Sequence, residues 1–121
     1  MKMKLLGLRT SIYRVSDIEK AKKWYSEFLG FEPYFDEPFY VGYNVAGYEL
    51  GLQPEENETA EKGDSVITYW GIENVEEAYQ KLLELGATSH ETPQEVGGGI
   101  IVATVKDPWD NIFGVIYNPH F

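Results

Sequence analysis

The spacing of apolar residues changes from a strand-like to a helix-like period twice along this chain. The two matching stretches are TSIYRVSDIEKAKKWYSEFLG, residues 10–30, and ITYWGIENVEEAYQKLLELG, residues 67–86. Each opens with branched and aromatic residues that favour a strand, continues with apolar residues at helical spacing, and stops at a glycine. Short β-like runs follow each copy. The sequence therefore predicts a repeated unit of one strand, one helix and further strands, an arrangement that commonly places a cleft between the halves.

In the first half, residues 5–15 alternate loosely and favour a strand. Ser16 and Glu19 form a Ser-x-x-Glu capping box that starts a helix, with Asp17 as the alternative N-cap residue. Gly30 is predicted to end the helix in a left-handed conformation. One apolar stripe follows this helix and consists of Ile18, Ala21, Tyr25, Phe28 and Leu29.

Strands and turns are predicted for the rest of the first half. Residues 31–39 favour a short strand and an irregular loop, and residues 40–44 and 48–53 favour two strands joined by a turn over residues 45–47. Residues 54–64 are acidic and nearly without large apolar side chains, so we interpret them as the link between the halves.

The second half repeats this order. Residues 65–72 favour a strand, and Asn74 with Glu77 repeats the capping arrangement. The stripe of this helix consists of Val75, Ala78, Tyr79, Leu82 and Leu85. The remaining predictions are a short strand at 87–91, a flexible loop at 93–99, and a hairpin of strands 100–106 and 112–117 across the turn 107–111. The expected fold class is α+β, with two curved, mostly antiparallel half-sheets.

Length and composition limit the organisation and the partners. The 121 residues suffice for one domain, divided into module one at 1–53, the acidic linker at 54–64 and module two at 65–121. There is no cysteine, which excludes disulfides and thiolate chemistry. The formal charge of −10 disfavours nucleic acid and anionic membranes and would attract cations near a binding site. With no membrane-length apolar run and no signal sequence, we expect a cytoplasmic protein.

Three segments make the chain recognisable: RVSDIEKAKKWYSEFLGF near the start, GYELGLQ in the middle and VKDPWDNIFGVIYNPHF at the end. Together they resemble the glyoxalase / bleomycin-resistance / extradiol-dioxygenase superfamily, the vicinal oxygen chelate proteins. The resemblance implies paired βαβββ modules whose strands curve around one cleft, and a homodimer as the usual assembly.

The resemblance also implies where a metal would bind, because metal-dependent members place four ligands around the cleft. Those positions fall on Thr10, Glu49, Ile67 and Gly114 in this sequence. Only one of them carries a carboxylate, whereas a divalent ion needs three or four nitrogen or oxygen donors. We therefore predict no metal and no other cofactor.

Strand alternation predicts which side chains face the cleft. The candidate ligand-binding residues predicted in this way are Thr10, Ile12, Arg14, Glu49, Gln53, Ile67, Tyr69 and Gly114, and Trp109 is added as an aromatic residue that could contact a flat ligand. Arg14 and Gln53 fall where glyoxalase I relatives have an arginine and an asparagine, so Arg14 is either an anion anchor or the partner of Glu49 in a structural ion pair. Aromatic residues form either a platform for a flat ligand or part of the core or dimer interface: Trp109, Trp70, Tyr34, Phe35, Phe39 and Tyr40.

We predict no catalytic residue. His90 and His120 fall on no ligand position and are expected to be exposed surface histidines, and Gly97–Gly99 precede a strand, which disfavours a phosphate loop.

The favoured function is metal-free binding of a small aromatic or amphipathic molecule, cationic or not, as in drug-sequestering relatives of the bleomycin-resistance type. A lyase or isomerase resembling glyoxalase I is the alternative from the enzyme class. An accessory module that uses the fold as a dimer scaffold is the third hypothesis.

Overall fold

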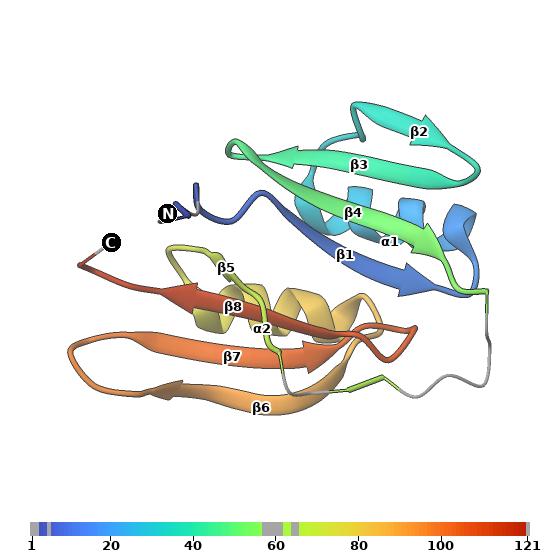
Figure 1. Cartoon of the computed structure of the whole chain (residues 1–121). Coiled ribbons are helices and arrows are strands. Elements are labelled where there is room, and N and C mark those ends of the chain that lie inside the picture. Colours follow the sequence, from blue (N-terminus) through green and yellow to red (C-terminus); the bar gives the residue numbers. More distant parts are fainter. Residues whose placement is uncertain (1–2, 5, 57–61, 64–65, 121) are drawn as a thin grey trace. The chain divides into compact units, whose positions relative to one another are not determined.

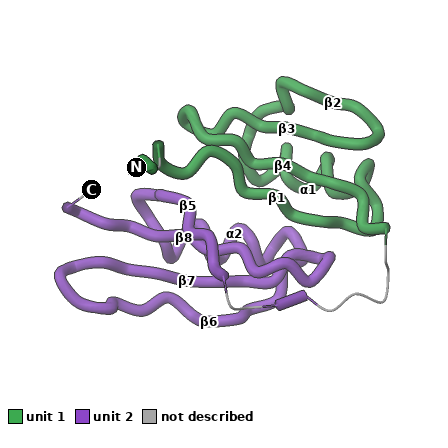
Figure 2. The backbone as a smooth tube through the Cα atoms, in the orientation of Figure 1, with its two compact units in different colours: residues 1–56 green, residues 57–121 purple. Residues whose placement is uncertain are grey.

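The order strand, helix, strand, strand, strand occurs twice along the chain, as the apolar spacing predicts. A computed structural model describes residues 3–4, 6–56, 62–63 and 66–120 and divides the chain into two units, residues 1–56 and 57–121 (Figure 1, Figure 2). Among the residues described, each unit contains one helix and one four-stranded sheet. The α+β fold class is confirmed.

In the first unit, the last strand lies beside the first strand and pairs with it. The elements of this unit are β1 (Thr10–Val15), α1 (Ile18–Leu29), β2 (Phe35–Glu37), β3 (Tyr40–Val45) and β4 (Tyr48–Pro54). The strands lie in the order β1-β4-β3-β2, with β1 parallel to β4 and the other pairs antiparallel.

The second unit has the same topology. Its elements are β5 (Tyr69–Gly71), α2 (Val75–Glu84), β6 (Thr88–Glu95), β7 (Ile101–Lys106) and β8 (Ile112–Tyr117). The order is β5-β8-β7-β6, again with the first and last strands parallel.

Both helices begin at a side chain that accepts a backbone hydrogen bond. Oδ1 of Asp17 accepts from the Lys20 amide (3.1 Å), so the alternative Asp17, and not Ser16 of the predicted capping box, is the N-cap residue of α1. Oδ1 of Asn74 accepts from the Glu77 amide (3.0 Å) at the start of α2. Gly30 ends α1 with φ 84°, as predicted, in the left-handed region where a side chain is unfavourable.

Each helix covers one face of its own sheet. In the first unit Tyr13 is buried on β1, with its ring 5.9 Å from that of Tyr25 on α1, and Leu50 and Leu52 are buried on β4. In the second unit Leu85, predicted in the helix stripe, is only half-buried. The buried apolar residues of that core are Val75, Ala78, Tyr79, Leu82, Ala87, Ala103, Val105, Phe113 and Val115.

Several predicted boundaries are wrong. β1 begins at Thr10, which pairs with Glu49 near the start of β4, and Leu6 and Leu8 lie before the strand and are exposed. β5 is shorter than the predicted 65–72, of which Ser65 lies outside the described residues.

β6 instead extends through the first part of the predicted 93–99 loop. It is the last strand in the sheet order, and Pro93 lies at a register shift between the pairs of Glu91 and Gln94, where a missing amide hydrogen is tolerated. Of the predicted linker, Pro54 belongs to β4, and residues 57–61 and 64 lie outside the described part of the chain.

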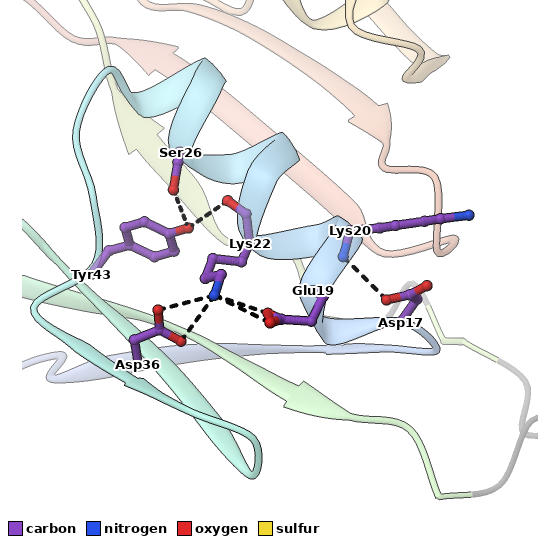
Figure 3. A network of polar contacts seen from close by, with 7 residues as sticks. All are labelled: Asp17, Glu19, Lys20, Lys22, Ser26, Asp36 and Tyr43. Carbon is purple, nitrogen blue, oxygen red and sulfur yellow. Dashed lines mark hydrogen bonds and ion pairs between the residues drawn. The ribbon is translucent and has the colours of Figure 1, made fainter.

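Polar groups tie α1 to the strands beside it (Figure 3). The ammonium of Lys22 lies 2.9 Å from Oε2 of Glu19 and 3.0 Å from Oδ2 of Asp36. The hydrogen bond to Glu19 is the largest cause that raises the pKa of Lys22, and the hydrogen bond to Asp36 is the next. The Tyr43 hydroxyl donates to the Lys22 carbonyl oxygen (2.9 Å) and is 2.8 Å from the Ser26 hydroxyl. Tyr43 therefore joins β3 to α1 from inside the core.

Neither helix, among the residues described, has the length and apolar character that a membrane-crossing helix needs.

We expect Tyr43→Phe to destabilise the protein by about 1–2 kcal/mol, because it removes the hydroxyl from a fully buried site with two hydrogen-bond partners. Urea unfolding followed by circular dichroism measures this change. Tyr117→Phe, on the exposed end of β8, is the matched control and should shift stability by less than about 0.5 kcal/mol. Equal effects of the two substitutions would contradict the role given to Tyr43.

Candidate functional site

The face of the first sheet opposite α1 carries five of the predicted site residues. The parallel register pairs Thr10 with Glu49 and Arg14 with Gln53, and Ile12 lies between them on β1. Because alternate residues of a strand point to opposite faces, these side chains share a face, whereas Tyr13 and Val15 point into the core. We call this the open face of the first sheet.

Two tyrosines hold the carboxylate of Glu49 on the open face. The hydroxyl of Tyr34 donates to Oε1 and the hydroxyl of Tyr40 donates to Oε2, so each carboxylate oxygen has its own phenol. We call this arrangement the Tyr34–Glu49–Tyr40 cluster. A carboxylate that accepts from both sides is fixed in orientation before any ligand arrives.

Two glycines make room for the rings. A Cβ atom at Gly51 would lie 2.7 Å from Cζ of Tyr40, and one at Gly42 would lie 3.2 Å from Tyr40 Cε2 and 3.3 Å from Tyr34 Cε1. The register pairs Gly42 with Gly51 across β3 and β4, so the two form one floor beneath the cluster. Any side chain at Gly51 would displace Tyr40.

The cluster keeps both phenols protonated. The hydrogen bond from Tyr34 to Glu49 is the main cause that raises the pKa of Tyr34. The pKa of Tyr40 is raised first by burial and then by the same carboxylate. Both residues therefore remain hydrogen-bond donors well into alkaline solution.

The register separates Arg14 from Glu49. Arg14 lies opposite Gln53, four residues further along β4, and the Glu49 carboxylate accepts hydrogen bonds from Tyr34 and Tyr40. The two phenols thus take the place that the sequence analysis gave to Arg14 in a structural ion pair. Arg14 and Gln53 instead stand side by side on the open face.

A pocket of about 260 Å³ opens beside the cluster, wholly within the first unit. Its lining combines one cation, one anion, neutral polar groups and two aromatic rings: Arg9, Thr10, Tyr34, Asn44, Tyr48 and Glu49. Thr10 and Glu49, two of the predicted site residues, therefore both line this pocket.

The β3–β4 turn forms one rim of the pocket. Its central residues, Ala46 (φ 52°) and Gly47 (φ 92°), are both left-handed, as a tight two-residue hairpin turn requires. Oδ1 of Asn44 accepts a hydrogen bond from the Gly47 amide (2.8 Å), which holds the turn. The turn thus fixes the positions of Asn44 and Tyr48 at the pocket.

In the second unit the register departs from the predicted ligand positions. Gly114 pairs with Tyr69, whereas Ile67 precedes β5. A Cβ at Gly114 would lie 2.7 Å from Cδ1 of Tyr69, so the tyrosine ring covers this glycine. The structure therefore brings together Tyr69 and Gly114 and leaves Ile67 outside the strand.

Trp109 lies in the turn between β7 and β8. The buried carboxylate of Asp107 accepts from the amides of Trp109 (2.9 Å) and Asn111 (2.8 Å), and the Lys62 ammonium donates to the Trp109 carbonyl oxygen (3.1 Å). These contacts give the backbone of Trp109 a structural role within the second unit.

The expectation for one histidine is wrong. His90 is half-buried, with Nδ1 2.9 Å from the hydroxyl of Thr104, a buried residue in register with Gly114. His120 is exposed as expected, and its Nε2 lies 2.9 Å from the Gly98 carbonyl oxygen.

The residues present do not fit the metal that the family implies. Of the four ligand positions, only Glu49 carries a carboxylate, and its two oxygens accept from tyrosines. Within the described ranges, no three His, Cys, Asp or Glu side chains come close enough to hold an ion. The donor set cannot supply the three or four ligands such an ion requires.

Comparison with known proteins identifies the family. The profile of the Glyoxalase/Bleomycin resistance protein/Dioxygenase superfamily matches residues 7–115. No curated protein sequence matches the chain.

Solved structures agree in fold. A glyoxalase-related enzyme from Fulvimarina pelagi has a TM-score of 0.76 at 19% identity, covering 95% of this chain and 90% of its own. A superfamily member from Sphaerobacter thermophilus DSM 20745 has a TM-score of 0.73 at 26% identity, covering 94% and 98%. A glyoxalase/bleomycin resistance protein from Albidiferax ferrireducens T118 has a TM-score of 0.75 at 17% identity, covering 92% and 98%. With most of its length matched by the family profile, the chain belongs to the glyoxalase/bleomycin resistance protein/dioxygenase superfamily.

Proposed function

We propose that this protein binds a small molecule through a protonated amine, without a metal ion, on the open face of its first sheet. The Tyr34–Glu49–Tyr40 cluster is the observation that carries the proposal. A carboxylate held by two phenols offers its remaining lone pairs to an ammonium group, and charge-assisted hydrogen bonds are the stronger kind. The tyrosine rings beside it suit the apolar part of an amphipathic ligand.

The size of the pocket favours a small ligand. Drug-sized molecules occupy pockets of roughly 300–1,000 Å³. The pocket beside Glu49 measures about 260 Å³, which is below that range. A compact amine with one ring or a short chain is therefore a better fit than a large antibiotic, and the formal charge of −10 would draw such cations to the protein.

One observation favours the enzyme alternative. Arg14 and Gln53 lie in register on the open face, and they match positions that hold the glutathione portion in relatives resembling glyoxalase I. The residues beside them lack the metal ligands that glyoxalase I-like chemistry uses, so we rank the lyase alternative second.

The amine is tested with phenethylamine and its uncharged analogue phenethyl alcohol, by calorimetry or thermal shift. We expect saturable binding of the amine only. Glu49→Gln should weaken it by up to about fivefold, because a partly exposed ionic hydrogen bond contributes up to about 1 kcal/mol. The control Glu27→Gln, on the exposed side of α1, should leave binding unchanged. Equal binding of the alcohol, or an unaffected Glu49→Gln protein, would sink the proposal.

Added Zn²⁺ or Ni²⁺ should leave the melting temperature of the chelator-treated protein within error, since only ligands that bind the native state raise it. Differential scanning fluorimetry at rising metal concentration checks this. A saturable increase that Glu49→Gln abolishes would instead support the lyase alternative.

Glu49→Gln should lower the pKa of Tyr34 towards its ordinary value of about 10, because the carboxylate is the main cause of its elevation. Tyr40 should fall less, because burial is its first cause. With pKa values raised in the folded state, the stability that the phenols contribute is present below about pH 10 and is lost above it. Titration of tyrosine-labelled protein by NMR measures the pKa values of Tyr34 and Tyr40. If the titration curves of the wild-type and Glu49→Gln proteins were the same, the cluster would be contradicted.

A further inference from the structure

A positive side chain shares the pocket with Glu49. Arg9 and Glu49 both line it, on backbone segments that are hydrogen-bonded neighbours, since the Glu49 amide donates to the Arg9 carbonyl oxygen (3.0 Å). Whatever occupies this space meets a guanidinium as well as a carboxylate. A simple organic cation would be attracted by one wall and repelled by the other.

The two charges have neutral partners. The guanidinium of Arg9 donates to the Leu6 carbonyl oxygen (2.7 Å), and the Glu49 carboxylate accepts from the two phenols. Among the residues described, no ion pair joins Arg9 to Glu49. Neither charge is neutralised by these partners, so each can still attract a group of opposite charge.

The chemistry of each group defines what it can take. A guanidinium has five N–H donors in a planar fork, and one bond to Leu6 leaves donors for a carboxylate. The carboxylate of Glu49 can accept only from a donor, and the phenols fix it in place. One end of the pocket thus suits an anion and the other an ammonium.

The remaining lining residues are neutral. Thr10 offers a hydroxyl, Asn44 an amide whose oxygen already accepts from Gly47, and Tyr48 a ring that is 50% exposed. These groups add no net charge, so the formal charge of the pocket lining is zero although that of the chain is −10. The overall charge therefore does not describe the site.

We infer that the ligand is a small zwitterion of the amino-acid type, whose ammonium contacts Glu49 and whose carboxylate contacts Arg9. This inference rests on the proposed amine-binding function and adds the anionic group. A molecule with both charges satisfies both walls, whereas a molecule with one charge leaves the other wall unmatched.

Three probes that share one side chain test the inference: phenylalanine, its primary amide, which carries only the positive charge, and N-acetylphenylalanine, which carries only the negative charge. Each is titrated into the wild-type protein and the variants Arg9→Gln and Glu49→Gln, with binding followed by amide NMR shifts of Gly47 and its neighbours. The controls Lys23→Gln and Glu27→Gln remove the same charges from the exposed side of α1.

We expect the wild-type protein to bind phenylalanine about fivefold more tightly than either derivative, since each exposed ionic contact contributes about that factor. Arg9→Gln should abolish the preference over the amide, and Glu49→Gln the preference over the N-acetyl compound. The control variants should keep the wild-type order.

The outcomes separate the two proposals. If the amide binds as tightly as phenylalanine and still depends on Glu49, the zwitterion is wrong and amine binding stands. If the N-acetyl compound binds best, or none of the three probes perturbs the pocket, both proposals fail.

Discussion

In each unit a single helix packs on one face of a four-stranded sheet, and the rest of the structure follows from this constraint. Residues that alternate along a strand must serve two environments. On β4, Leu50 and Leu52 are buried in the core beneath α1, while Glu49 and Gln53 project from the opposite face. The same alternation that builds the core therefore presents polar side chains in fixed register on the face opposite the helix.

The open face depends on close packing between aromatic rings and backbone. A half-buried carboxylate requires donors, and on this face they come from phenols on neighbouring segments. Those rings reach Glu49 only because Gly42 and Gly51 leave the sheet surface bare beneath them. The glycines, the tyrosines and the carboxylate thus form a single arrangement, in which each member makes the others possible.

The local features of this fold were predictable from sequence, because they depend on neighbouring residues. The cap at Asn74, the stop at Gly30 and the turn after Lys106 follow from side-chain chemistry within a few positions, and the same chemistry placed the start of α1 within one residue, at Ser16 instead of the observed Asp17. The family resemblance, carried by three segments, is likewise confirmed by the profile match and the similar structures.

Features that depend on pairing between distant strands were not predictable. β1 begins where its pairing with β4 begins, and the pairing of Gly114 with Tyr69 rather than Ile67 is a matter of register. Shared orientation suggested that Arg14 meets Glu49, but the register sets Arg14 beside Gln53. Tyr40 reaches Glu49 only through the alignment of β3 with β4, and Tyr34 only because the segment before β2 bonds to Gly42, although the small residues at 42 and 51 were a signal of rings above them.

The parallel pairing of the first and last strands in each unit has a consequence for biosynthesis. β1 cannot acquire its partner until β4 has been translated, so the chain must close a long loop before this contact stabilises anything. Such non-local closure slows folding relative to a simple hairpin. On the ribosome the nascent first unit would complete its sheet while the second is still being synthesised. The β3–β4 hairpin forms from residues adjacent in sequence, so it can form first and β1 can then pair with it.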